Sequence, residues 1–124
     1  MKLRTLLTAF LFAAVFTVSA GAHHSINAEF DSNKPITLAG TVINVDWMNP
    51  HTYVFVDVKD PEFHKTRTWA CELASPAELA RRGFTRESLK VGMSVRIVGS
   101  RAKDGSFKIH TDTLAAENGV SLTK

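Results

Sequence analysis

One short helix is predicted to divide a chain of otherwise strand-like runs. Ser75 suits the N-cap, Pro76 suits the first helical position, and Glu78 can complete a capping box. Gly83 supplies a stop soon afterwards. Runs rich in Val, Ile and Thr, several with alternating polar and apolar residues, predict three strands before the helix and two after it, over residues 36–46, 52–58, 66–73, 94–100 and 107–114. The chain is therefore expected to be mainly β.

This order of elements is that of an OB-fold. Such a fold is a five-stranded Greek-key barrel, here with one short helix between the third and fourth strands. Gly40 lies inside the first run, where a residue without a side chain lets a strand bend sharply. We expect the OB-like barrel over residues 36–115, an extended N-terminal arm over residues 23–35 and a frayed C-terminal tail over residues 116–124.

The first 22 residues have the pattern of a secretory signal peptide. Lys2 and Arg4 precede an apolar run from Leu6 to Val18, and Ala20 and Ala22 provide the small side chains that signal peptidase requires. The apolar run is shorter than the roughly 20 residues that a membrane anchor needs, and no later segment is apolar enough to span a bilayer. We therefore expect a periplasmic or secreted protein with one domain, cleaved after Ala22 or, alternatively, after Ala20.

The charge of the chain argues against nucleic acid as a partner. The formal net charge is +3, and it includes two basic residues of the predicted leader, Lys2 and Arg4, so the mature domain carries only about +1. A nearly neutral domain lacks the basic surface that nucleic-acid binding usually needs.

Cys71 is the only cysteine, which excludes an internal disulfide. Alternation places Trp69, Cys71 and Leu73 on one face of the third strand, with Ala70 and Glu72 on the other. The pattern predicts a buried, inert thiol. A soft metal ligand or an intermolecular disulfide is the alternative interpretation.

Two histidines follow the predicted cleavage site. If the mature chain begins with His23, its α-amine and imidazole Nδ1 can chelate one ion, with His24 or a distant imidazole as a further ligand. Nitrogen ligands favour copper(II) among the divalent ions. The arrangement resembles the histidine brace of copper oxygenases and of some copper carriers. Cleavage after Ala20 would instead place His23 third, which resembles the amino-terminal copper and nickel motif. The alternative is that both histidines are polar residues without a specific role and that they bind copper only adventitiously.

His51 is the natural partner of these two histidines. It follows Asn49 and Pro50 in a predicted loop, and the arm before Pro35 could span up to about 40 Å if extended. The candidate metal ligands are therefore His23, His24 and His51. The alternative for His51 is a loop histidine hydrogen-bonded to backbone. The two remaining histidines, His64 and His110, are expected to be solvated on the surface.

A second candidate site is a ligand-binding surface on the second strand and the loop before it. Trp47, Asn49, Tyr53 and Phe55 lie on the part of an OB barrel that usually contacts ligands, and their rings could stack on a sugar or a peptide side chain. The alternative is that these aromatic side chains belong to the core. No nucleophile elbow, phosphate-binding glycine loop, zinc-type cysteine cluster or spaced carboxylate pair is present, so no sequence motif predicts an enzyme.

Several segments together resemble an uncharacterised family of small secreted bacterial proteins, a domain of unknown function of the DUF6152 type. These segments are Ala22-His23-His24-Ser25, Trp47-x-Asn49-Pro50-His51, Glu72-Leu73-x-Ser75-Pro76, Arg81-Arg82-Gly83-Phe84 and Arg101-Ala102-Lys103-Asp104-Gly105. The resemblance spans almost the whole predicted mature chain. It implies export and a compact β-rich domain but no activity.

The sequence thus predicts an exported binding protein that holds copper or another divalent ion through His23, His24 and His51. The alternative is a metal-free periplasmic module that binds a small ligand or an extracytoplasmic protein partner.

Overall fold

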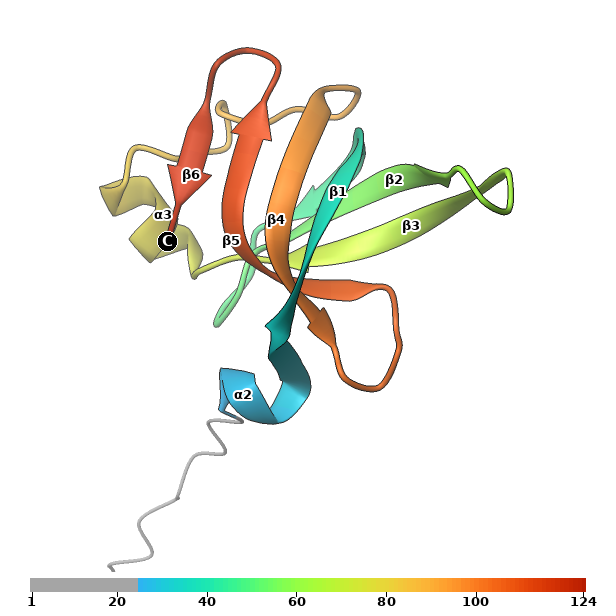
Figure 1. The fold of residues 1–124 in the computed structure, drawn as a ribbon. Helices are drawn as coiled ribbons and strands as arrows, with labels where there is room; N and C mark the ends of the chain where they lie inside the picture. Colours follow the sequence, from blue (N-terminus) through green and yellow to red (C-terminus); the bar gives the residue numbers. More distant parts are fainter. Residues whose placement is uncertain (1–24) are drawn as a thin grey trace, which may run out of the picture.

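The computed structural model describes residues 25–124 and is mainly β (Figure 1). Its elements, in chain order, are α2 (Ile26–Glu29), β1 (Phe30–Asp46), β2 (Tyr53–Asp60), β3 (Lys65–Glu72), α3 (Pro76–Arg81), β4 (Ser94–Ala102), β5 (Lys108–Ala116) and β6 (Ser121–Thr123). Within this part of the chain, no helix is long and apolar enough to cross a bilayer.

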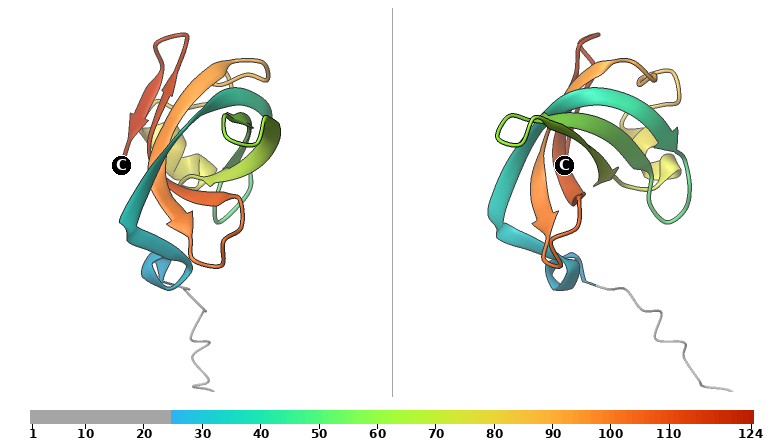
Figure 2. Two further views of the ribbon diagram at one scale, coloured as in Figure 1. Left: turned by 45° about the vertical axis from the view of Figure 1, so that its right-hand side comes forward. Right: turned by 90° about the vertical axis from the view of Figure 1, so that its right-hand side faces the viewer.

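The six strands form one sheet whose pairings return to their starting point. The order is β3-β2-β1-β4-β5-β6, and β3 also pairs with β5. β3 and β5 pair in parallel through Ala70, Cys71 and Glu72 of β3. Every other pairing in this sheet is antiparallel. The pairings among β1, β2, β3, β5 and β4 therefore form a closed circuit. Figure 2 shows the sheet curving round on itself, with β6 outside the circuit.

Gly40 lies where β1 passes from one neighbour to the other. The strand pairs with β4 as far as Thr41 and with β2 from Thr41 onward. A Cβ atom at Gly40 would lie 2.2 Å from the carbonyl oxygen of Asp57 on β2, so the backbones approach more closely here than any side chain allows. The absence of a side chain at Gly40 permits this close approach at the position where β1 changes partner.

The two ends of the domain are more ordered than the sequence predicts. Residues 26–29 form the helix α2 and are not extended, whereas residues 30–35 are extended but already belong to β1, where Phe30 is buried and pairs with Ala102 of β4. Nor is the tail frayed, since β6 pairs with β5 and buries Leu122 against the core. A strand of three residues is too short to show an alternating pattern, so its burial is decided by tertiary packing.

Helix α3 begins and ends as its local sequence predicts. The hydroxyl of Ser75 accepts a hydrogen bond from the backbone N–H of Glu78, and Gly83 adopts a φ of 77° just beyond the helix. Leu79 is fully buried and attaches the helix to the core.

Replacing Ser75 by Ala should lower the free energy of unfolding by about 1 kcal/mol, because the N–H of Glu78 loses its acceptor. Urea denaturation followed by circular dichroism measures the change. An unchanged midpoint would mean that the cap contributes nothing to stability.

Cys71 is a fully buried core residue. Its neighbours in the alternating pattern, Trp69 and Leu73, are buried on the same face, as the sequence predicts. Burial raises the pKa of the thiol to about 12, so the reactive thiolate is nearly absent at neutral pH. The expectation of a buried thiol is confirmed.

Candidate functional site

A buried carboxylate lies at the end of β3, between two other strands. Glu72 pairs with Tyr53 of β2 on one side and with His110 of β5 on the other. It points to the face opposite Cys71, as alternation predicts, yet its side chain is only 6% exposed. An ionised carboxylate in such a position is stable only when it is paired and hydrogen-bonded.

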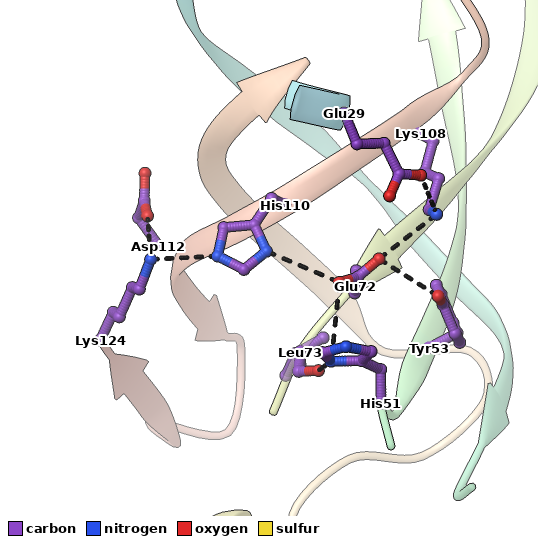
Figure 3. A network of polar contacts seen from close by, with 9 residues as sticks. All are labelled: Glu29, His51, Tyr53, Glu72, Leu73, Lys108, His110, Asp112 and Lys124. Atoms are coloured by element: carbon purple, nitrogen blue, oxygen red, sulfur yellow. Dashed lines mark hydrogen bonds and ion pairs between the residues drawn. The ribbon is translucent and has the colours of Figure 1, made fainter. Parts of the chain in front are cut away.

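Four side chains contact the two oxygens of Glu72 (Figure 3). The hydroxyl of Tyr53 donates a hydrogen bond to Oε2 at 3.1 Å, and Nζ of Lys108 lies 3.3 Å from the same oxygen. The Nδ1 atoms of His51 and His110 lie 3.6 and 3.8 Å from Oε1. Burial alone would raise the pKa of Glu72, but the neighbouring His110, His51 and Lys108 outweigh it and lower the pKa to about 2. Glu72 is therefore an anion at all physiological pH values.

Lys108 links this carboxylate to α2. Its ammonium lies 2.6 Å from Oε1 of Glu29 on α2 and over the rings of Phe30 and Tyr53, at 5.4 and 5.5 Å from their centroids. Burial lowers the pKa of Lys108, but the hydrogen bond to Glu29 and the nearby Tyr53 and Glu72 raise it above its ordinary value. Burial and the negative charge of Glu72 raise the pKa of Tyr53, so its hydroxyl stays protonated as a donor.

His51 is held in one tautomer by backbone. Its Nδ1 lies 3.2 Å from the carbonyl oxygen of Leu73. A carbonyl can only accept, so Nδ1 donates this hydrogen bond, and the second ring nitrogen, Nε2, is not used in it. The side chain is 40% exposed, which leaves one side of the ring open. This is the arrangement that metal-binding histidines usually show, with one nitrogen fixed by an acceptor and the other free.

His110 is not the solvated surface residue that the sequence predicts. It points outward from β5, but it is only 8% exposed, because the ring of Phe30 packs 5.4 Å away and covers that face. Its Nε2 lies 3.0 Å from Nζ of Lys124. The same ammonium lies 3.8 Å from Oδ1 of Asp112. The helix and strand that sequence analysis missed, α2 and β6, bring Phe30 and Lys124 to this imidazole.

A cavity of about 190 Å³ lies beside the two imidazoles. Its apolar lining includes Leu73, Leu79 and Leu122, and its polar lining comes from α3, β5 and the loop before β2. The complete lining is Ile26, His51, Leu73, Ala74, Glu78, Leu79, Arg82, His110, Thr111, Asp112, Leu122 and Lys124. His51 and His110 thus face one hollow, although they lie far apart in the sequence.

Of the three predicted metal ligands, His51 lies in this site. His23 and His24 lie outside the described residues. Ile26, two residues after His24, lines the cavity together with His51. Taken alone, residues 25–124 contain no group of three or more His, Cys, Asp or Glu side chains placed to hold a metal ion.

The four predicted ligand-binding residues lie in three different surroundings. Tyr53 and Phe55 lie side by side on β2, with ring centroids 6.5 Å apart and both partly exposed. The ring centroid of Trp47 instead lies 6.1 Å from that of Phe84, a buried residue that follows α3 in the chain. Asn49 is exposed in the loop before β2.

The family to which the chain belongs follows from its sequence. The model of a family of unknown function, DUF6152, matches residues 12–110. The chain is a member of DUF6152. The match covers the two histidines before Ser25 and every side chain that contacts Glu72. The resemblance found in the short sequence segments is therefore confirmed.

Comparison with solved structures and with curated proteins does not indicate a function for this DUF6152 protein. One chain in the crystal structure of a complex of TiaS with a transfer RNA and ATP matches with a TM-score of 0.49 and 18% identity, over 69% of this chain and 18% of that chain. This chain therefore spans about a fifth of that structure's length. No curated protein matches.

Sequence reasoning about this DUF6152 protein missed Glu72, Lys108 and His110. One signal was present, because Lys108, His110 and Asp112 alternate along β5 and mark one polar face. Alternation alone does not distinguish a solvated face from one covered by a distant segment. Glu72 brings these polar side chains together, but in the sequence it resembles an ordinary exposed carboxylate at the end of a strand.

Proposed function

We propose that this DUF6152 protein is an exported protein that binds copper or a similar divalent ion through His23, His24 and His51. The single observation that carries the proposal is the position of Ile26, which lines the same cavity as His51. One residue spans at most about 3.5 Å of chain, and His24 precedes Ile26 by only two residues in the sequence. This short connection supports a site that combines the histidine pair with His51.

The chemistry of His51 supports the same function. The backbone carbonyl oxygen of Leu73 accepts a hydrogen bond from Nδ1, which leaves Nε2 as the nitrogen for an ion, and the carboxylate of Glu72 lies 3.6 Å from Nδ1. A carboxylate behind a ligating imidazole increases its basicity and stabilises the cation that it binds. Together with an α-amine and the imidazole of His23, this gives a nitrogen ligand set, which favours copper(II).

The proposal includes an OB-like Greek-key barrel as the scaffold. The closed circuit of β1, β2, β3, β5 and β4, with α3 between the third and fourth strands, supports it. In such a barrel the loop before β2 and the start of that strand belong to the usual ligand-binding surface. His51 lies in that loop.

The second candidate function is a metal-free periplasmic module for a small ligand or an extracytoplasmic protein partner. It is favoured by the neighbouring rings of Tyr53 and Phe55, which are partly exposed on one face of β2. Paired aromatic rings on a strand surface suit stacking on a sugar or a peptide side chain. In this alternative, copper binds only weakly at the chain terminus.

Copper titration of the exported protein separates the two functions. Mass spectrometry first identifies the processed terminus, and calorimetry with copper(II) chloride then gives stoichiometry and affinity. We expect one ion per chain, and we expect His51→Ala to weaken binding about tenfold or more, because a nitrogen ligand is lost.

His64→Ala is the matched control, because His64 is an exposed imidazole in the turn between β2 and β3. The register places that turn at the opposite end of these strands from Tyr53 and Glu72, about 20 Å away along the strands. Equal affinities for the two variants would contradict the copper site and leave the metal-free module.

A further inference from the structure

We propose that Arg67 and Arg101 form a second binding site, which takes a phosphate monoester. This site goes beyond the proposed copper function and is separate from it. Arg67 precedes Glu72 by five residues on β3, which is about 17 Å along an extended strand. Arg101 lies near the end of β4, and the loop from β4 to β5 runs beside β3, where the N–H of Ala70 donates to the carbonyl oxygen of Phe107 (Figure 1).

Both guanidinium groups stack on aromatic rings. The Cζ atom of Arg67 lies 5.1 Å from the ring centroid of Phe107. The Cζ atom of Arg101 lies 5.3 Å from the centroid of Trp69 and 5.9 Å from that of Phe107. The two rings meet edge to face with centroids 5.2 Å apart, and Trp69 belongs to the core. Stacking orients a guanidinium and leaves its N–H edge free for an acceptor, so one anchored ring pair presents two positive charges.

In the part of the chain that the structure describes, no carboxylate forms an ion pair with either arginine. Nη2 of Arg101 donates to the carbonyl oxygen of Gly105 at 3.0 Å, but its Nε is buried without a hydrogen-bond partner. Asp104, the acidic residue of the same loop, uses Oδ1 to accept a backbone N–H of its own turn. Like charges near one ring repel each other, and a buried N–H without an acceptor is unfavourable. An oxyanion bound to both arginines relieves both effects.

The charge and surroundings of the two arginines favour a phosphate monoester among oxyanions. Arginine binds phosphate and carboxylate through paired N–H bonds. A phosphate monoester approaches a dianion at neutral pH, because its second pKa is about 6, so it matches two arginines better than a carboxylate does. Phe107 is 41% exposed, so an apolar group of the ester can pack against its ring. The ligand class is therefore an organic phosphate with an apolar substituent, present as a soluble ester or as a lipid headgroup.

Calorimetry with phenyl phosphate tests the site in the exported protein. We expect saturable binding, with benzoate at least about tenfold weaker because it carries less charge. Arg67→Gln and Arg101→Gln should each weaken phenyl phosphate binding about tenfold, since each removes a charged hydrogen-bond donor. Arg96→Gln is the matched control, because Arg96 is exposed on the opposite face of β4 and its loss changes the net charge equally.

Phosphatidylcholine vesicles with and without phosphatidic acid distinguish the two sources of the phosphate. Capture only by the vesicles that contain phosphatidic acid, lost in Arg67→Gln, supports a lipid headgroup. Phenyl phosphate binding without capture supports a soluble ester, and both together support a site that accepts either.

The proposal is overturned if neither phenyl phosphate nor the phosphatidic acid vesicles bind. It is also overturned if Arg67→Gln and Arg101→Gln bind as tightly as Arg96→Gln, because the two arginines then only cover the core beside Trp69. Arg67 is partly exposed, so its variant is informative even if Arg101→Gln does not fold. Copper affinity should be the same in Arg67→Gln as in the wild type, so failure of either site is seen independently of the other.

Discussion

Gly99→Ala should lower the free energy of unfolding by about 3 kcal/mol or more. We expect no other glycine-to-alanine substitution in the described domain to be more destabilising. A Cβ atom at this position would lie 2.0 Å from the carbonyl oxygen of His110 and 3.0 Å from Cγ1 of Ile109. The obstructing oxygen belongs to the backbone of the paired strand and cannot rotate away. The β4–β5 register already shifts between Val98 and Gly99, so the two strands must separate where His110 is positioned.

Urea denaturation measured by tryptophan fluorescence tests this expectation, with Gly119→Asn as the control. Gly119 has a φ of 86° in an open turn, and a Cβ there would meet no atom within 4 Å. Because Asn tolerates this backbone conformation, the control should lose less than about 1 kcal/mol. If Gly99→Ala unfolds at the same urea concentration as the control, β4 and β5 do not approach each other so closely.

Glu72→Gln should lower the free energy of unfolding at pH 7 by about 3 kcal/mol and change how stability depends on acid. The pKa of Glu72 falls from 4.5 to about 2 on folding. A carboxyl group with a lowered folded-state pKa stabilises the fold fully above its unfolded-state pKa. That contribution is lost as the pH falls from about 4.5 toward 2, and it is absent in the glutamine variant.

The measurement is a series of urea titrations between pH 7 and pH 2.5, with Glu62→Gln as a control of equal charge. Glu62 is exposed in the turn between β2 and β3, so its loss should not alter the shape of the stability curve. The difference between wild type and Glu72→Gln should be largest at pH 7 and should shrink below pH 4.5. If the free energy of unfolding depends on pH in the same way for Glu72→Gln and Glu62→Gln, the contacts of the buried Glu72 carboxylate do not stabilise the fold.

Most of the secondary structure could be predicted because its causes are local. The cap at Ser75, the stop at Gly83 and the alternation of Val54 with its neighbours act over a few residues. A special role for Gly40 in β1 was also predictable, since only glycine fits where two backbones meet so closely. The predictions that failed concern α2 and β6, short segments that are ordered by residues far away in sequence.

Only part of the candidate site could be predicted in the same way. His51 stood out by its residue type and its loop, and the structure places it at the cavity. Glu72 did not stand out, because nothing local distinguishes it from a solvated strand-end carboxylate. Its role depends on Tyr53 from β2 and His110 from β5, which the parallel pairing of β3 with β5 brings to either side of it.

The sequence by itself determined β1 to β5, helix α3 and the family, since periodicity, capping and short motifs are properties of neighbouring residues. Tertiary structure alone decided which charges are buried. Phe30 covers His110, Glu29 holds Lys108, and Lys124 reaches His110 from the last strand. The physical reason is that the pKa of a carboxylate and the exposure of an imidazole depend on everything within a few ångströms, and that neighbourhood is assembled from both ends of the chain.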